Sequence, residues 1–282
     1  MYQEYGLFIN GQWRSAKGNH SKPVVDPATE TEIGRIPLAV QEDLDEALTC
    51  AQQAFKSWRH VSPWIRSAKL RQTADLIRSR AQQIAMLMCC ETGKPLAEAM
   101  GEVQAAADQF EWYSEEAKRI YGQTIEARDR QTRMSVIYQP VGVVAAFSAW
   151  NFPALLPARK IAAALAAGCS IIIKPASEAP GSCMALVQAC KDAGINDGVL
   201  NLVTGDSSLI SRHLIESPVV RKVSLTGSTD VGKGILHQAA EGVKKVSMEL
   251  GGHAPVIVFE DADGAAAARI LASSKFRNCG QV

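Results

Sequence analysis

Two polar residues that directly follow apolar runs have side chains suited to carbonyl chemistry. Asn151 lies in W-N-F-P at residues 150–153, and its neutral amide could donate a hydrogen bond to an oxyanion. Glu249 begins E-L-G-G-H, where two glycines suggest close approach of the backbone to a ligand and the carboxylate could act as a general base. Each residue also has a simpler interpretation, because asparagine often caps a helix and glutamate is most often a surface residue.

A second group of residues follows other apolar runs and is suited to binding a nucleotide. Lys174 comes after S-I-I-I and begins K-P-A-S, where its ammonium could reach a ribose hydroxyl or a phosphate, although a lysine at a strand end is usually solvated. Gly227 and Ser228 follow K-V-S-L and begin the next predicted helix, whose first amide groups favour a pyrophosphate. The glycine fingerprint G-x-G-x-x-G does not follow the first strand of this region, so the usual dinucleotide-binding motif is missing.

Two further interpretations fit less of the pattern. Gly227, Gly232 and Lys233 match a phosphate-binding P-loop, but Gly234 stands where that motif needs a hydroxyl to hold Mg²⁺. A P-loop NTPase is therefore a distant alternative. His253 is interpreted as a structural loop residue because no second metal-ligating residue stands at ligand spacing, so no metal site is expected.

The composition of the chain excludes several classes of partner. Its 282 residues are 47% hydrophobic and 21% charged, and 30 basic and 29 acidic side chains leave a net charge of +1, so neither nucleic acid nor a membrane is expected as a partner. No apolar run reaches membrane-spanning length, and the N-terminus lacks the pattern of a signal peptide. Seven cysteines without a C-x-x-C pair indicate free thiols and a cytoplasmic location.

The first third of the chain is predicted to be mostly helical. After a β-like start over residues 8–13 with a turn at Gly11, apolar residues at helical spacing predict a helix over residues 43–59. Start signals that include proline predict two more helices, over residues 62–90 and 95–118. Ser62 followed by Pro63 marks the start of the second helix, as a cap with proline at the first helical position. The polar, β-like residues 123–139 then predict a hairpin that stands apart from the core.

From Val141 onward, short apolar runs alternate with helical stretches. Strands are predicted at residues 141–147, 170–173, 199–203 and 222–225, with helices near 155–167, 181–193, 207–215 and 229–241. A further strand pair, 244–250 and 255–259, precedes an alanine-rich helix over residues 263–276. This alternation predicts an α/β fold in which helices cover both faces of a parallel sheet and ligands bind at the C-terminal ends of the strands.

Five motifs in one order carry a resemblance to a known family. W-N-F-P, K-P-A-S, T-G-S and E-L-G-G, followed by F-R-N-C-G-Q, resemble the NAD(P)-dependent aldehyde dehydrogenase superfamily along the whole chain. The resemblance implies a three-layer α/β fold with a Rossmann-like parallel sheet that binds its cofactor without the usual glycine fingerprint. It also places the family's nucleophilic cysteine one residue beyond Val282, so the chain by itself is expected to be inactive, with an incomplete catalytic domain. Cys279 stands four residues too early to replace that nucleophile, because misplacing a catalytic group by about 1 Å is costly.

The resemblance also assigns roles to individual residues. Asn151 matches the oxyanion-hole asparagine, and Glu249 matches the base that activates water for thioester hydrolysis. The residues implied in binding the cofactor are Trp150, Asn151, Lys174, Pro175, Ala176, Ser177, Gly227, Ser228 and Leu250.

Two departures from the commonest family pattern bear on the ligands. Ser177 stands where many NAD-preferring members have a glutamate that would repel a 2′-phosphate, so NAD or NADP is expected as cofactor, with NADP tolerated or preferred. Arg159 stands where general aldehyde dehydrogenases often have an aromatic residue and succinate-semialdehyde-type members have arginine. An arginine there could bind a substrate carboxylate, which predicts a short acid semialdehyde, while the alternative is an arginine on a helix surface.

These observations predict a division of the chain and a type of partner. Residues 1–250 are expected to form an NAD(P)-binding domain, helical over 40–120 and with its parallel sheet over 141–250, and residues 251–282 to begin a catalytic domain. By the resemblance, hairpin 123–139 would contribute to a homo-oligomer of the parent enzyme, whose substrate is a small aldehyde. The alternative to an enzyme is a non-catalytic NAD(P)-binding remnant or the product of a pseudogene.

Overall fold

A seven-stranded sheet forms the centre of the computed structural model, which describes residues 5–282. Its strand order is β11-β10-β7-β8-β9-β1-β2. The strands are β1 (Leu7–Ile9), β2 (Gln12–Arg14), β7 (Val143–Phe147), β8 (Ser170–Lys174), β9 (Leu200–Leu202), β10 (Val220–Thr226) and β11 (Lys245–Glu249). The five strands from β11 to β9 are parallel, as expected, whereas β1 and β2 extend the sheet in antiparallel fashion.

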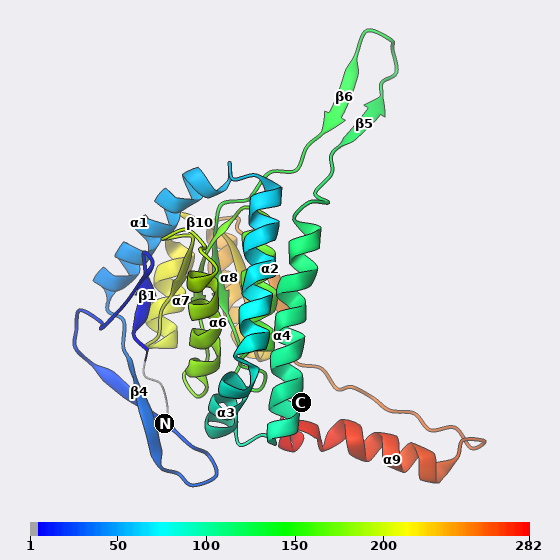
Figure 1. Cartoon of the computed structure of the whole chain (residues 1–282). Coiled ribbons are helices and arrows are strands. Elements are labelled where there is room, and N and C mark those ends of the chain that lie inside the picture. Colours follow the sequence, from blue (N-terminus) through cyan, green and yellow to red (C-terminus); the bar gives the residue numbers. More distant parts are fainter. Residues whose placement is uncertain (1–4) are drawn as a thin grey trace.

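Helices cover both faces of this sheet (Figure 1). One face carries α1 (Gln41–Trp58), α7 (Ser207–Glu216) and α8 (Thr229–Glu241), and the other carries α5 (Leu155–Ala166) and α6 (Pro180–Asp192). A further layer, built from α2 (Pro63–Ser79), α3 (Ala81–Thr92) and α4 (Leu96–Glu116), packs outside α5 and α6. Strands β7 and β8 are buried along their whole length, which is why V-V-A-A-F and S-I-I-I lack polar alternation.

The predicted helix over 62–90 is wrong at one point. Its start is confirmed, since the Ser62 hydroxyl accepts a hydrogen bond from the Trp64 amide, but Arg80 leaves helical geometry (φ −105°, ψ 11°) and separates α2 from α3. Both helices pack against α6, so apolar spacing continues across the break. The guanidinium of Arg80 pairs with Asp192 at 2.7 Å. A one-residue break of this kind leaves no mark on hydrophobic periodicity.

Two small antiparallel sheets stand outside the central one. Hairpin β5 (Gln123–Glu126) and β6 (Arg133–Val136) projects from the body with all its residues exposed, as predicted (Figure 1). The pair β3 (Ser21–Val25) and β4 (Glu32–Pro37) was not predicted.

The last segment of the chain leaves the body of the molecule after β11. Residues 251–259 are exposed and form no strand, so the predicted strand 255–259 is wrong, because no strand lies beside this run to complete a ladder. Helix α9 (Gly264–Lys275) forms as expected but buries no residue, and the short turn η1 (Arg277–Gly280) returns to α4 (Figure 1). Within residues 5–282, no helix is long and apolar enough to cross a membrane.

Candidate functional site

The C-terminal ends of the parallel strands surround a cavity of about 1140 Å³, here called the main cavity. Parallel strands end at the same edge of a sheet, so residues far apart in the sequence meet there. Every predicted site residue except Pro175 lines it: Trp150, Asn151, Arg159, Lys174, Ala176, Ser177, Gly227, Ser228, Glu249 and Leu250. Cys279 does not line the main cavity, and its sulfur lies 3.6 Å from the carbonyl oxygen of Gly93.

Lys174 provides a buried cation at the end of β8. Its ammonium donates to the carbonyl of Pro175 at 3.2 Å, and burial lowers the pKa of the side chain. An ammonium has three protons, so this group retains donors for a phosphate or ribose oxygen in the cavity. Ser177, on the loop that follows β8, is half-buried and carries no charge, while Glu178 beside it is exposed and also lines the cavity.

The start of α8 faces the same cavity. The Ser228 hydroxyl caps this helix by accepting the amide of Val231 at 3.4 Å, and Gly227 precedes the cap. Gly232 allows the close approach of Leu250, since a Cβ at this glycine would lie 2.6 Å from the leucine Cδ2. The first turn of α8 therefore presents amide groups that favour an anionic ligand.

The same geometry argues against a P-loop. Helix α8 begins at Thr229, so Lys233 lies in its second turn, where its ammonium faces Asp230 at 3.8 Å and is largely exposed. His253 lies on the exposed run after β11. Among the described residues, no group of three His, Cys, Asp or Glu side chains could hold a metal ion.

Asn151 is held on several sides at the mouth of the main cavity. Its side-chain amide donates to the carbonyl of Gln281 at 3.0 Å. The backbone carbonyl of Asn151 accepts hydrogen bonds from the Lys94 ammonium at 3.0 Å and from the side-chain amide of Asn278 at 2.8 Å. The predicted oxyanion donor therefore lies directly beside the F-R-N-C-G-Q-V segment, which returns from α9.

Glu249 and Arg159 contact each other across the cavity wall. One carboxylate oxygen of Glu249 lies 3.2 Å from the Arg159 guanidinium, and the other accepts the Thr226 hydroxyl at 2.9 Å. The two charged side chains are 54% and 45% exposed, so the pair contributes only about 0–1 kcal/mol. A competing carboxylate can therefore replace Glu249 beside the Arg159 guanidinium, and a water molecule can replace either partner.

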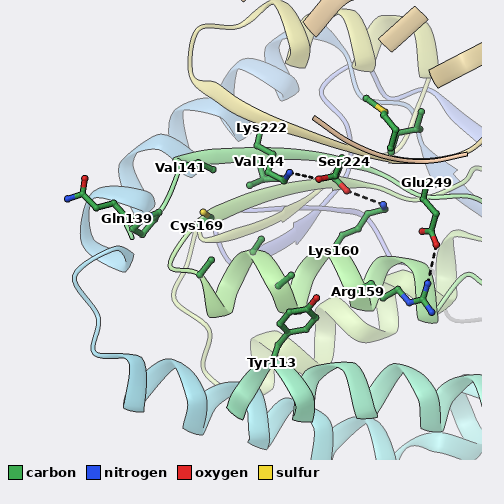
Figure 2. A pocket seen from close by; sticks show the side chains of 17 residues that line it. Tyr113, Gln139, Val141, Val144, Arg159, Lys160, Cys169, Lys222, Ser224 and Glu249 are labelled. Carbon is green, nitrogen blue, oxygen red and sulfur yellow. Dashed lines mark hydrogen bonds and ion pairs between the residues drawn. The ribbon is translucent and has the colours of Figure 1, made fainter. Parts of the chain in front are cut away.

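A second cavity of about 430 Å³ lies on the other side of this ion pair (Figure 2). Arg159, Leu225 and Glu249 line both cavities. Lys160, next along α5, donates to the Ser224 hydroxyl at 3.1 Å, and burial lowers its pKa to about 8, a shift that the charge of Glu249 partly opposes. A lysine with this pKa can exchange a proton near neutral pH.

Sequence reasoning missed several residues at the site. Lys160 directly follows Arg159, but a single lysine on a helix gives no sign of burial. Arg277, within F-R-N-C-G-Q, lines the main cavity and lies with its guanidinium 5.7 Å from the centre of the Phe152 ring. Lys94 and Glu102 lie beneath Asn151. The sequence placed Lys94 just before a predicted helix and Glu102 within it, and gave neither residue a role at the site.

The lowered pKa of Lys160 predicts a pH-dependent contribution to stability. Because its pKa in the folded chain is below the usual value near 10.5, the unfolded chain binds more protons between pH 8 and 10.5, and the free energy of unfolding from this group rises with pH. Lys160→Met should flatten that rise when urea unfolding is measured between pH 7.5 and 10. An unchanged slope would contradict the assigned burial.

Comparisons with known proteins agree with the geometry. The family model described as "Aldehyde dehydrogenase family" matches residues 13–282. Glutarate-semialdehyde dehydrogenase of Pseudomonas putida is 46% identical over 274 residues, and succinate-semialdehyde dehydrogenase [NADP(+)] of Escherichia coli is 44% identical over 273 residues. Each alignment covers 97% of this chain but 57% of the relative, so the chain spans little more than half the length of these proteins.

A solved structure matches the whole fold described above. The crystal structure of succinate-semialdehyde dehydrogenase from Burkholderia pseudomallei has a TM-score of 0.97 and 42% sequence identity, and the match covers 99% of this chain and 58% of that one. The layered α/β fold therefore occurs in a protein of related sequence. With the family pattern extending over residues 13–282, the chain belongs to the aldehyde dehydrogenase family.

Proposed function

We propose that residues 1–282 supply the cofactor site, the oxyanion donor and the general base of an NAD(P)-dependent enzyme that oxidises a short acid semialdehyde to the dicarboxylate. The observation that carries this proposal is the main cavity, where Asn151, Glu249 and Arg159 meet the residues suited to a nucleotide. The names of the two relatives, a glutarate-semialdehyde and a succinate-semialdehyde dehydrogenase, support the same substrate class.

Each of the three residues has a distinct chemical task. The amide of Asn151 would donate to the aldehyde oxygen as it gains negative charge under attack by a cysteine thiolate. That cysteine would follow Val282, as the family resemblance implies. Glu249 would take a proton from the water that releases the acyl group, which requires the carboxylate to leave Arg159. NAD(P)⁺, when bound, supplies the hydride acceptor.

The substrate class follows from the cations of the main cavity. Arg159 and Arg277 both line it, and a guanidinium binds a carboxylate through paired hydrogen bonds. The weak Arg159–Glu249 contact leaves this guanidinium available to a substrate anion. A short aldehyde with a terminal carboxylate, such as succinate or glutarate semialdehyde, fits this arrangement better than an uncharged aldehyde.

The cofactor side of the cavity favours NADP. Lys174 and the first turn of α8 offer donors to phosphates, and Ser177 places no carboxylate where the 2′-hydroxyl of NAD would bind. The printed name of the Escherichia coli relative includes NADP(+), and this supports the same choice.

We further propose that residues 1–250 form the cofactor unit and that 251–282 begin the catalytic unit. The exposure of residues 251–264 and the absence of buried residues in α9 support a boundary near Gly251. Hairpin β5–β6 exposes Ile125, Met134 and Val136, which supports a role in contacts between subunits of a homo-oligomer. We expect the parent enzyme to act in the cytoplasm.

The second candidate function is binding of NAD(P) without catalysis. It is favoured by the position of the cofactor residues, which all precede residue 251, and it needs no cysteine. The two functions differ in one readout. Joining residues 1–282 to the C-terminal part of the Escherichia coli relative, from the position that follows Val282 in the alignment, should give semialdehyde-dependent NADPH formation if the first proposal holds. Binding of NADP⁺ by this extended protein without turnover would favour the second.

Replacing Ser177 should change cofactor preference. Ser177→Glu should raise the Kd for NADP⁺ by roughly tenfold or more and leave the Kd for NAD⁺ nearly unchanged, because the new carboxylate repels the 2′-phosphate. Isothermal titration calorimetry on the 282-residue chain measures both constants. Ser177→Gln, of the same size without the charge, is the matched control. Equal weakening of both cofactors by Ser177→Glu would contradict the proposal.

Replacing Arg159 should change substrate preference in the extended protein. Arg159→Leu should lower kcat/KM for succinate semialdehyde by about 10–100-fold, the effect of losing hydrogen bonds to a charged group, and change kcat/KM for butanal much less. Arg212→Leu, on the exposed surface of α7, serves as control. If both aldehydes lost efficiency equally, Arg159 would have a structural role and the assigned substrate class would fail.

A further inference from the structure

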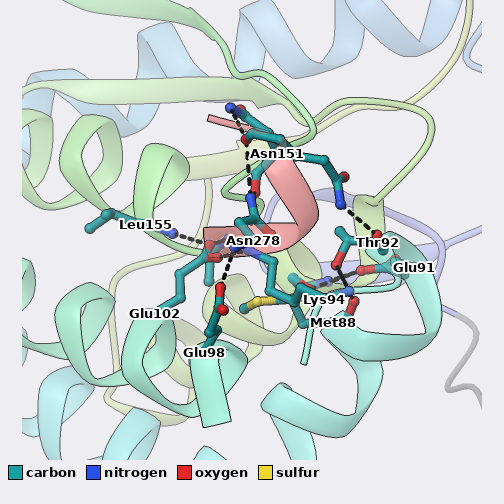
Figure 3. Close-up of polar contacts among 12 residues, drawn as sticks. Met88, Glu91, Thr92, Lys94, Glu98, Glu102, Asn151, Leu155 and Asn278 are labelled. Carbon is teal, nitrogen blue, oxygen red and sulfur yellow. Dashed lines mark hydrogen bonds and ion pairs between the residues drawn. The ribbon is translucent and has the colours of Figure 1, made fainter. Parts of the chain in front are cut away.

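A buried ion pair lies directly beneath the loop that carries Asn151 (Figure 3). The ammonium of Lys94, from the link between α3 and α4, contacts the carboxylate of Glu102 in α4. The two side chains are 1% and 3% exposed. Removing two charges from water is expensive, and an apolar pair of similar volume is often as stable, so stability alone does not account for this pair.

The pair binds the chain at Asn151 and at the start of α5, three and four residues later. The Lys94 ammonium also donates to the carbonyl oxygen of Asn151 at 3.0 Å. One oxygen of Glu102 accepts the amides of Ala154 at 2.9 Å and Leu155 at 3.1 Å, at the start of α5. The backbone from residue 151 to residue 155 is therefore fixed to α4 and to the link before it by charge-assisted hydrogen bonds, which are stronger than neutral ones.

The same region fixes the segment that returns from α9. The carboxamide of Asn278 donates to the carbonyls of Asn151 at 2.8 Å and Gln281 at 3.1 Å, and its backbone amide donates to Glu98 of α4. The Gln281 amide donates to the carbonyl of Thr92 at 3.1 Å, at the end of α3. Asn151 and Asn278 thus donate to one shared oxygen, that of Gln281. Helices α3 and α4 hold both the oxyanion donor and the segment beside it.

From these contacts we propose that Lys94 and Glu102 are positioning residues: they fix the Asn151 carboxamide relative to residues 278–281. The proposal rests on the proposed function, which gives Asn151 its catalytic role. An oxyanion donor must be held within about 0.5 Å of its working position, and a displacement of about 1 Å costs roughly 100-fold in rate. Buried charged groups that bond to Asn151 itself and to the start of α5 meet this requirement, whereas an apolar contact would let the loop slide.

The test measures the position of Asn151 in the 282-residue chain by NMR of selectively labelled asparagine. The carboxamide protons of Asn151 and Asn278 lie close together because both donate to Gln281, so a cross-peak between them is expected. Lys94→Met should abolish this cross-peak and shift the Asn151 carboxamide resonances, while Lys94→Arg, which keeps the charge and a donor, should retain the cross-peak.

Lys69→Met is the matched control. Lys69 also donates to a backbone carbonyl, that of Gly194, and to the Asn196 side chain at 2.9 Å, but it ties α2 to the loop after α6. Both lysine variants should lower Tm, and only Lys94→Met should alter the Asn151 and Asn278 signals. If Lys94→Met lowers Tm and leaves those signals unchanged, the pair has a purely structural role and the proposal is overturned.

A second variant covers the case in which Lys94→Met does not fold. Glu102→Gln keeps an oxygen for the amides of Ala154 and Leu155 but loses the charge that holds Lys94, so the Asn151 signals should shift while the α5 amides remain bonded. Unchanged Asn151 signals in this variant would also overturn the proposal. Titration of the unaltered chain with NADP⁺ separates the two hypotheses: an absence of binding counts against the proposed function, and the NMR result still decides the role of the pair.

Discussion

Lys94 and Glu102 form an ion pair that is almost fully removed from water and that bonds to the backbone at Asn151 and at Ala154, at the start of α5. The final segment of the chain is fixed at the same part of the structure, beside helices α3 and α4. The final segment of the chain approaches Asn151 through Asn278 and Gln281, which are in turn held by Glu98 and Thr92. No residue of the outer helices α3 and α4 lines the main cavity. These helices nevertheless determine where its polar groups lie.

Glu91, three residues before Lys94, makes a similar contact to the start of another helix. Glu91, at the end of α3, accepts the amides of Gly181 and Ser182 and the Ser182 hydroxyl, and so holds the start of α6. Helix α6 follows the loop that begins after Lys174 and carries Ser177. The short stretch from Glu91 to Glu102 therefore contacts both the loop that carries Asn151 and helix α6, which follows the loop that carries Ser177. A carboxylate that accepts several backbone amides is a strong, directional support in a low-dielectric interior.

The sheet itself accounts for the rest of the arrangement. Residues 141–147 and 170–173 are apolar on both faces because helices cover both sides, and the polar residues that follow each strand are left at one edge. At that edge the Arg159–Glu249 contact separates two cavities, and its partial exposure makes it weak. The weak Arg159–Glu249 contact suits two residues that exchange partners. The buried Lys94–Glu102 pair suits a loop whose residues must stay in place.

The strands and helices of the α/β part could be predicted because each carries its own signal, such as the run S-I-I-I or the cap at Ser62. Three features could not. The break at Arg80 preserves the apolar face of two helices, so periodicity continues through it. Residues 255–259 have the composition of a strand but no neighbouring strand to bond with. The pairing of β3 with β4 depends on a turn over residues 26–31 with little apolar alternation around it.

For the site, the sequence by itself determined which residue types follow the strands, and the order of W-N-F-P, K-P-A-S, T-G-S and E-L-G-G was enough to indicate the family. Each motif is a short run of consecutive residues, so it can be identified without knowing which other segments surround it in space. Only the tertiary structure decided that Lys94 and Glu102 meet beneath Asn151, that Lys160 is half-buried with its pKa lowered to about 8, and that Arg277 reaches the cavity of Arg159. The reason is physical: burial, charge pairing and a shifted pKa belong to the surroundings of a side chain, and those surroundings come from segments that lie far away in the sequence.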